Sequence, residues 1–221
     1  MTNVYPRKKT MPVLIGVSQR VTTVTEYVER RDALDQRWAA FLTFCGLIPI
    51  FIPNHPPTVR LLLEEVPLNG FLLTGGNNLV VLGGDAPERD EAELLLLEYA
   101  ITNGKPLLGV CRGMQLIQHF FGAQLEQVSD HVTAGHRILG IGSERTVNSY
   151  HLYGARTSPL GLNATARAED GIVEAVQHVS FPLKGIMWHP ERCDPFDEMD
   201  RNMFWNFFGS RVSLKYLKGA G

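Results

Sequence analysis

Residues 107–121 read L-L-G-V-C-R-G-M-Q-L-I-Q-H-F-F, and the rest of the chain is interpreted from this stretch outward. Its first four residues are apolar or small, which is typical of a short buried strand. From Met114 to Phe121 the apolar residues recur at helical spacing, so a helix follows at once. Cys111 therefore stands where a strand turns sharply into a helix, between Gly109 and Gly113. The sequence predicts a strand–turn–helix unit with a cysteine at its corner.

The pattern around this corner, G-x-C-x-G, is that of a nucleophile elbow, which lifts a reactive side chain clear of the backbone. The small neighbours leave room for another molecule to approach. The N-terminus of the following helix favours negative charge, so it stabilises the thiolate form of Cys111. A cysteine that only fills the core is the alternative, because free cysteine is usually buried. The glycines on both sides favour the nucleophile.

The composition is that of an ordinary globular chain. Its 221 residues predict one domain, and a net charge of −2 gives no basic surplus for nucleic acid or an anionic membrane. Three widely spaced cysteines predict neither a disulfide framework nor a metal clip, which fits a cytoplasmic setting. The first residues lack a signal-peptide pattern, and no run of eighteen apolar residues predicts a membrane span.

Outward from residues 107–121, strands and helices alternate along the chain. Buried strands are predicted at 13–17, 47–52, 70–74, 107–110, 172–176 and 185–188. Helices are predicted at 32–45, 58–66, 87–103 and 196–208, besides the one after Cys111. Residues 21–31 show no period and predict a loop, whereas 122–147 predict short antiparallel strands carrying loops. This alternation predicts a parallel sheet covered by helices on both faces.

A thiolate nucleophile needs a base that holds and returns a proton, and the base needs an orienting partner. Among seven histidines the best candidate is His189, which follows the predicted strand at 185–188. Ligands of open parallel sheets bind at the carboxyl ends of the strands, where this residue lies. Glu191 is two residues further on, beyond Pro190, and its carboxylate can return to the imidazole. A histidine at a strand end is otherwise often structural.

The segments G-V-C-R-G-M-Q and W-H-P-E, with 78 positions from Cys111 to His189, resemble the class I glutamine amidotransferase superfamily, in its γ-glutamyl hydrolase branch. The resemblance implies a Cys111–His189–Glu191 triad that cleaves γ-glutamyl amides through a thioester. The expected fold is α/β, a flavodoxin-like three-layer sandwich with a mostly parallel central sheet and a small antiparallel addition. Residues 12–210 are expected to form this single domain, with loose termini at 1–11 and 211–221.

Acyl transfer also needs donors for the developing oxyanion. The backbone N–H of Arg112 is one candidate, because it follows the nucleophile at the helix start. Gly75 or Gly76, after the third strand, is the second, as in similar enzymes; a simple turn is the alternative. Gln115 lies one helical turn after Cys111 on the same face, and the resemblance implies that it holds the glutamyl group.

The segment V-N-S-Y-H at 147–151 resembles a part of the γ-glutamyl hydrolase branch that borders the substrate pocket. It makes Asn148, Ser149, Tyr150 and His151 candidate substrate-binding residues. Ser149 or its neighbouring backbone is expected near the α-carboxylate, whereas surface packing is an equal alternative for His151.

No metal site is predicted. The spacing H-x4-H of His131 and His136 lies in a stretch that predicts an irregular polar loop, and no acid or cysteine in the sequence pattern completes a ligand set. No cofactor is expected either.

The predicted activity is cysteine-dependent hydrolysis of glutamine or of another γ-glutamyl amine, releasing glutamate and ammonia or amine. Since 221 residues hold no second catalytic domain, an ammonia-accepting synthetase has to be a separate chain. The charged segment that includes Arg20, Tyr27 and Asp35 resembles the hydrolase branch found with cell-surface polysaccharide genes. That branch releases a nucleotide or sugar amine, although a charged helix face is normally just solvated. A catalytically retired binding or regulatory protein on the same fold is the alternative, but such proteins lose a triad residue and this chain keeps all three.

Overall fold

The structure, a computed structural model, describes residues 12–140 and 143–209. Nine strands form its main sheet, in the order β4-β1-β5-β6-β13-β12-β11-β8-β9. The first five of these are mutually parallel, and the remaining pairings are antiparallel. In chain order the parallel strands run 2-1-3-4-5, which is the flavodoxin-like arrangement. The predicted α/β fold with a parallel core and an antiparallel addition is confirmed.

The parallel strands are β4 (Ile48–Phe51), β1 (Leu14–Val17), β5 (Gly70–Leu73), β6 (Leu107–Val110) and β13 (Leu183–Ile186). The antiparallel strands are β12 (Val173–His178), β11 (Leu162–Ala168), β8 (Val132–Gly140) and β9 (Ser143–Tyr150). The α-helices are α1 (Arg37–Phe44), α2 (Pro56–Glu65), α3 (Pro87–Asn103), α4 (Arg112–Phe120) and α5 (Glu198–Phe208). Short elements complete the chain: β7 (Glu126–Gln127), β10 (Tyr153–Gly154), and 3-10 turns at η1 (Val80–Leu82) and η2 (Pro190–Arg192).

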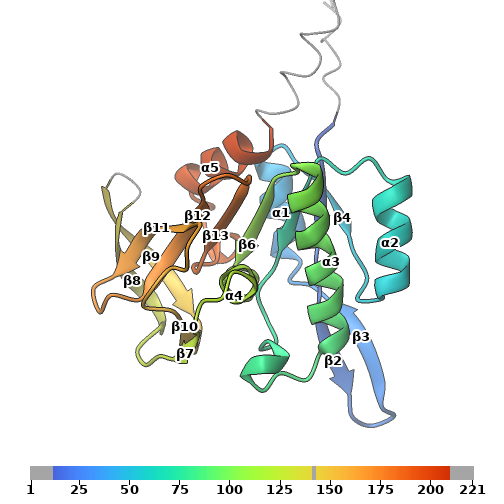
Figure 1. Cartoon of the computed structure of the whole chain (residues 1–221), viewed down its shortest axis with the longest axis horizontal. Coiled ribbons are helices and arrows are strands. Elements are labelled where there is room, and N and C mark those ends of the chain that lie inside the picture. Colours follow the sequence, from blue (N-terminus) through green and yellow to red (C-terminus); the bar gives the residue numbers. More distant parts are fainter. Residues whose placement is uncertain (1–11, 141–142, 210–221) are drawn as a thin grey trace, which may run out of the picture.

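Two helical layers cover the two faces of the parallel strands (Figure 1). On one face, Phe41 of α1 and Phe204 of α5 pack in a core with Leu72 and Leu108 of the strands. On the other face, residues of α2, α3 and α4 pack against the neighbouring strand residues, such as Phe71. Alternate residues of each strand thus serve opposite faces, because successive strand side chains point to opposite sides. Strands buried on both faces explain the unbroken apolar runs in the sequence.

Two parts of the structure differ from the sequence prediction. The predicted loop at 21–31 is wrong, because β2 (Arg20–Val24) and β3 (Glu29–Ala33) pair there as an antiparallel hairpin outside the main sheet. Almost all of β3 is exposed, so it carries no apolar alternation that sequence analysis detects. The hairpin also shortens the helix predicted at 32–45, which begins only at Arg37. Strand β11 was not predicted; its residues, L-N-A-T-A-R-A, include four alanines or threonines and little apolar bulk.

The predicted corner at Cys111 is present between β6 and α4. The backbone of Cys111 has φ 52° and ψ −105°, a conformation that is strained for a residue with a side chain. A Cβ on Gly109 would lie 2.4 Å from a backbone atom of Gly113, and one on Gly113 would lie 2.3 Å from the carbonyl oxygen of Leu73. Only glycines therefore allow α4 to lie this close to the sheet and hold the corner.

The termini predicted to be loose, 1–11 and 211–221, and the last residue of the predicted domain lie outside the described residues. Among the helices that the structure describes, none is both long enough and apolar enough to cross a membrane.

Candidate active site

Cys111, His189 and Glu191 come together at the carboxyl ends of β6 and β13. Nδ1 of His189 lies 2.7 Å from Oε1 of Glu191, and all three side chains are buried. A carboxylate only accepts here, so Nδ1 carries the ring proton and Nε2 is the nitrogen that remains for chemistry. Within the described residues Nε2 has no hydrogen bond of regular geometry. The thiol of Cys111 interacts with the same ring.

The charge state of His189 follows from these neighbours. Burial alone would lower its pKa, but contacts with Cys111 and Glu191 outweigh burial and raise the pKa to about 9. At neutral pH the ring of His189 is therefore an imidazolium, a proton donor that lies beside the thiol of Cys111. A cation next to a thiol is the setting in which cysteine nucleophiles are found.

The backbone of His189 is fixed by one side chain. Asn148 of β9 accepts a hydrogen bond from the backbone N–H of His189 at 2.7 Å and donates to its carbonyl oxygen at 2.8 Å. The oxygen and the nitrogen of the Asn148 amide are therefore both hydrogen-bonded to the backbone of His189, and neither faces a ligand. The antiparallel extension thus positions the base that the parallel strands carry.

Gly75 lies against both reacting groups. A Cβ at this position would be 2.6 Å from Cε1 of His189 and 3.6 Å from Cβ of Cys111. The carbonyl oxygens of Thr74 and Gly75 accept hydrogen bonds from Nη2 of Arg89, at 2.8 and 3.0 Å. In a trans peptide the N–H points opposite to the carbonyl, so the N–H groups of Gly75 and Gly76 point away from Arg89. This orientation suits donors to an oxyanion.

Sequence analysis missed Arg89, which is fully buried in α3. Burial lowers its pKa to about 10, and Glu93, one turn later, contacts it at 2.9 Å. Glu93 also pairs with the buried guanidinium of Arg112, and together the two arginines hold the pKa of Glu93 below its usual value despite its burial. The Arg112 side chain is thus structural, whereas its backbone N–H stands in the first turn of α4, where no intrahelical acceptor exists.

The remaining predicted residues lie outside the lining of the cavity beside the triad and have partners of their own. Gln115 is buried and donates to the carbonyl oxygen of Tyr153 at 2.9 Å. Ser149 is buried and donates to the carbonyl oxygen of His131 at 2.7 Å. The ring of Tyr150 meets that of His189 edge to face, with centroids 5.7 Å apart.

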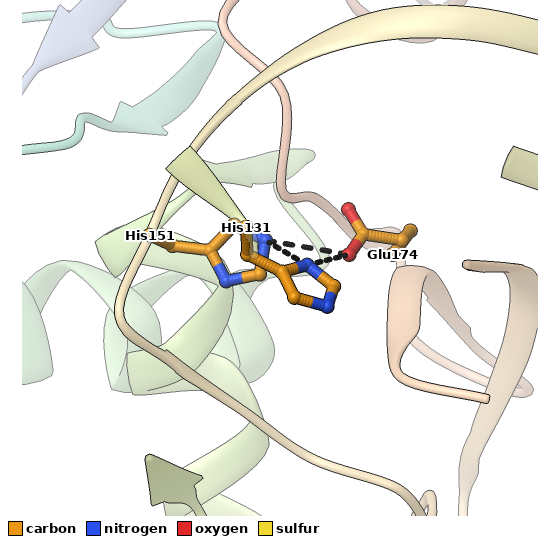
Figure 2. Close-up of side chains that lie close together, drawn as sticks. All are labelled: His131, His151 and Glu174. Carbon is orange, nitrogen blue, oxygen red and sulfur yellow. Dashed lines mark hydrogen bonds and ion pairs between the residues drawn. The ribbon is translucent and has the colours of Figure 1, made fainter. Parts of the chain in front are cut away.

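His151 belongs to a second buried group, with His131 and Glu174. Figure 2 shows its ring, that of His131 and the carboxylate of Glu174 turned toward one another. These three residues come from β12 and from the ends of β8 and β9. The irregular loop predicted around His131 and His136 is wrong, because His131 directly precedes β8 and His136 lies within it. Sequence analysis did not single out Glu174, whose one signal is an acid inside an apolar strand.

A cavity of about 380 Å³ opens beside the triad. Its lining includes the residues of the site, Gly75, Gly76 and His189, and the charged residues Arg20, Asp35 and Arg192. Gly76 has φ +91°, and a Cβ there would touch Arg20, so the β2–β3 hairpin closes over this turn. The hairpin that sequence analysis missed therefore forms part of the wall.

The sequence profile of the peptidase C26 family matches residues 12–191, which include Cys111, His189 and Glu191. This chain belongs to the peptidase C26 family. The peptidase C26 family lies within the class I glutamine amidotransferase-like superfamily, so the resemblance seen in the sequence is confirmed. Its members are amidotransferases or γ-glutamyl hydrolases that act on carbon–nitrogen bonds.

Three proteins illustrate where the chain stands among peptidase C26 and related proteins. A γ-glutamyl-CDP-amidate hydrolase of Campylobacter jejuni is 26% identical over 185 residues, covering 81% of this chain and 90% of that protein. One subunit of the glutamine-hydrolysing GMP synthase from Methanosarcina barkeri is 29% identical, covering 67% of this chain and 82% of its own length. The crystal structure of a Thermoplasma acidophilum protein, assigned as a GMP synthase subunit, superposes with a TM-score of 0.71 at 20% identity. The superposition covers 94% of this chain and 98% of that one, and it supports the fold.

Proposed function

We propose that this chain is a cysteine hydrolase that cleaves the amide bond of a γ-glutamyl amine through a glutamyl thioester. One observation carries the proposal: the strained corner at Cys111 faces an imidazole that Glu191 orients at 2.7 Å and whose pKa is raised to about 9. Nucleophile, base and orienting carboxylate are the parts that acyl transfer needs. Membership of the peptidase C26 family supports the same reaction class.

In the first half of the reaction the thiolate of Cys111 attacks the γ-carbonyl carbon. The carbonyl oxygen becomes an oxyanion, which the backbone N–H groups of Arg112 and of Gly75 or Gly76 stabilise. One such donor is worth roughly 3–4 kcal/mol in other enzymes. The imidazolium of His189 then gives its proton to the leaving nitrogen, the C–N bond breaks, and ammonia or an amine departs.

In the second half, neutral His189 takes a proton from water, and the resulting hydroxide attacks the thioester. The carbon–sulfur bond breaks, glutamate leaves, and the proton on His189 restores the imidazolium–thiolate pair. Glu191 keeps Nε2 facing the reaction in both halves, because it holds the proton on Nδ1. We assign the glutamyl end of the substrate to the side of Gln115, Ser149 and Tyr150, with Asn148 and His151 acting on it through other residues.

The cavity beside the triad indicates the class of the leaving amine. Two arginines, Arg20 and Arg192, line it. The same lining holds two acids, Asp35 and Glu191, and Glu191 contacts both His189, at 2.7 Å, and Arg192, at 3.6 Å. With His189 protonated, three cations face two carboxylates, so the balance favours an anionic group. A phosphoramidate of a nucleotide or sugar fits that charge, and the Campylobacter jejuni relative is a hydrolase of such a compound. We infer that the leaving group carries phosphate, as in nucleotide-sugar or surface-polysaccharide synthesis.

The test is glutamate release from three substrates: glutamine, γ-glutamyl-aminobutyrate and a γ-glutamyl phosphoramidate. We expect the isolated chain to prefer the phosphoramidate, and Arg20→Gln to lower kcat/KM for it while leaving glutamine turnover unchanged. Arg60→Gln, an exposed arginine on α2, is the matched control. Glutamine turnover that is sluggish alone and rises on addition of a synthetase would instead identify a partnered glutaminase. No release from any substrate, with wild type and Cys111→Ala alike, would overturn the enzymatic proposal.

A further inference from the structure

The cluster of His131, His151 and Glu174 lies outside the reaction described above. All three side chains are at least 98% buried, and they come from positions up to 43 residues apart in the sequence. Both carboxylate oxygens of Glu174 are buried without a hydrogen bond of regular geometry among the described residues. A buried carboxylate without such partners requires a positive charge nearby.

The outer nitrogens of the two rings fix which nitrogen faces inward. Nδ1 of His151 lies 3.0 Å from the carbonyl oxygen of Tyr153, and Nε2 of His131 lies 3.2 Å from Oδ2 of Asp170. Both partners only accept, so these two nitrogens carry the ring protons. In neutral rings the inward atoms, Nδ1 of His131 and Nε2 of His151, therefore present lone pairs. An imidazole held by an outer carbonyl or carboxylate is the usual support of a metal ligand.

The inward atoms are spaced as the ligands of a tetrahedral ion are. Nδ1 of His131 is 3.2 Å from Nε2 of His151 and 3.2 Å from Oε1 of Glu174, and Nε2 of His151 is 3.3 Å from that oxygen (Figure 2). Ligand bonds of about 2.0–2.1 Å to a tetrahedral Zn²⁺ place neighbouring ligand atoms about 3.3–3.4 Å apart. Three lone-pair atoms at this spacing repel one another unless a proton or a cation lies between them.

A fourth donor stands at the same place. Nε2 of His136, on β8, lies 3.4 Å from Oε1 of Glu174, and it too is buried without a regular hydrogen bond in the described part of the chain. Imidazole nitrogens with one carboxylate suit Zn²⁺ better than Mg²⁺ or Ca²⁺, which prefer oxygen ligands. We propose that His131, His151 and Glu174 bind a structural Zn²⁺ ion, with His136 on the side of the fourth position.

Such an ion would stiffen the wall of the active site. The carbonyl oxygen of Tyr153 accepts from both His151 and Gln115, and the carbonyl oxygen of His131 accepts from Ser149. Two candidate substrate residues are thus attached to the backbone of the ligand-bearing segments. The metal acts on substrate binding through these segments and takes no part in bond cleavage.

The experiment measures Zn²⁺ binding itself, independently of activity. Purified Cys111→Ala protein, which removes a competing thiol, is stripped with a chelator and titrated with Zn²⁺ against a chromogenic competitor. Co²⁺ is added to a second sample, whose visible absorption distinguishes tetrahedral coordination. We expect one ion per chain, a tetrahedral Co²⁺ spectrum and a higher Tm with metal, since an ion bound only by the folded chain stabilises it.

Variants at the proposed site are expected to lose Zn²⁺ affinity to different degrees. Glu174→Gln is expected to weaken Zn²⁺ binding more than about 100-fold, and Asp170→Asn, which supports His131 from outside, by about 10–100-fold. His119→Gln, an exposed histidine of α4, is the control and should bind as the parent does. Absence of stoichiometric binding by the parent, or equal binding by parent and Glu174→Gln, would overturn the proposal. Should a variant fail to fold, the parent's stoichiometry and Co²⁺ spectrum decide alone.

Discussion

The His189–Glu191 pair and the His131–His151–Glu174 cluster are both buried groups of imidazole and carboxylate, but different atoms face their inner nitrogens. At His189 the carboxylate holds the outer nitrogen, and the inner one faces a thiol across the space that Gly75 leaves. In the cluster, Tyr153 and Asp170 hold the outer nitrogens, and the inner ones face a carboxylate. The same residue types thus suit proton transfer in one place and metal binding in the other.

The largest expected loss of activity comes from the group that contains His189, through its partner Cys111. Cys111→Ala removes the nucleophile, so we expect glutamate release to fall by at least about 10⁴-fold, as in other enzymes that lose a nucleophile. Circular dichroism and Tm should stay close to wild type, because a small side chain replaces another of similar size. Steady-state assays on the preferred substrate measure this, and a variant that keeps most of its activity would exclude Cys111 from the reaction.

A change in the orienting carboxylate comes next. Glu191→Gln keeps the shape but no longer holds a proton on Nδ1, and we expect kcat to fall by about 10³-fold or more, since a triad acid that becomes an amide costs about 10⁴-fold in another enzyme. Glu174→Gln, the matched change in the other group, should leave kcat nearly unchanged. Equal losses of kcat in Glu191→Gln and Glu174→Gln would contradict the different roles given to the two groups.

The space beside His189 is the third point of difference. Gly75→Ala adds a methyl group 2.6 Å from Cε1 of the imidazole, so the ring has to move. We expect kcat to fall by about 10²-fold, which is what misplacement of a reacting group by about 1 Å costs. Gly83→Ala is a control for loss of a glycine, since a Cβ at that turn meets no atom within 4 Å, although its φ is +80°. A Gly75→Ala enzyme with the kcat of wild type would show that the close contact of residue 75 with the His189 ring does not matter for the reaction.

The pH dependence tests the charge of His189. Its pKa in the folded chain, about 9, exceeds the unfolded value of 6.5. Protonated His189 therefore stabilises the fold fully below pH 6.5, and this stabilisation is lost as the pH rises through 9. Activity should lose its proton donor over the same range, and kcat/KM should fall about tenfold per pH unit above 9. A profile that stays flat to pH 10 would contradict the raised pKa.

The smallest effect concerns the cluster. Because Ser149 and Gln115 are hydrogen-bonded to its segments, Glu174→Gln should raise KM several-fold while kcat changes little. A chelator should do the same to wild type and nothing further to the variant. Substrate saturation curves with and without chelator separate the two constants. A loss confined to kcat would place Glu174 in the reaction rather than beside it.

The two groups also differ in how far the sequence predicts them. Cys111, His189 and Glu191 belong to short segments whose glycines, strand ends and spacing are local signals, and the parallel half of the sheet was predicted for the same reason. The sequence did not indicate Glu174 or Arg89 as site residues. A charged residue in a strand or helix is usually solvated, and only the tertiary fold buries it. The hairpin β2–β3 and strand β11 lacked apolar alternation, so their pairing depends on neighbours that the local sequence does not reveal.

A covalent glutamyl thioester at Cys111 is the intermediate that the proposed reaction requires, and rapid acid quenching followed by mass spectrometry detects it. The chain is mixed with excess γ-glutamyl substrate, quenched during turnover and digested. We expect a mass increase of one glutamyl group on the peptide that contains Cys111, and none on those of Cys45 and Cys193 or in the Cys111→Ala protein. Turnover without any such adduct, with Cys111→Ala still releasing glutamate, would contradict it.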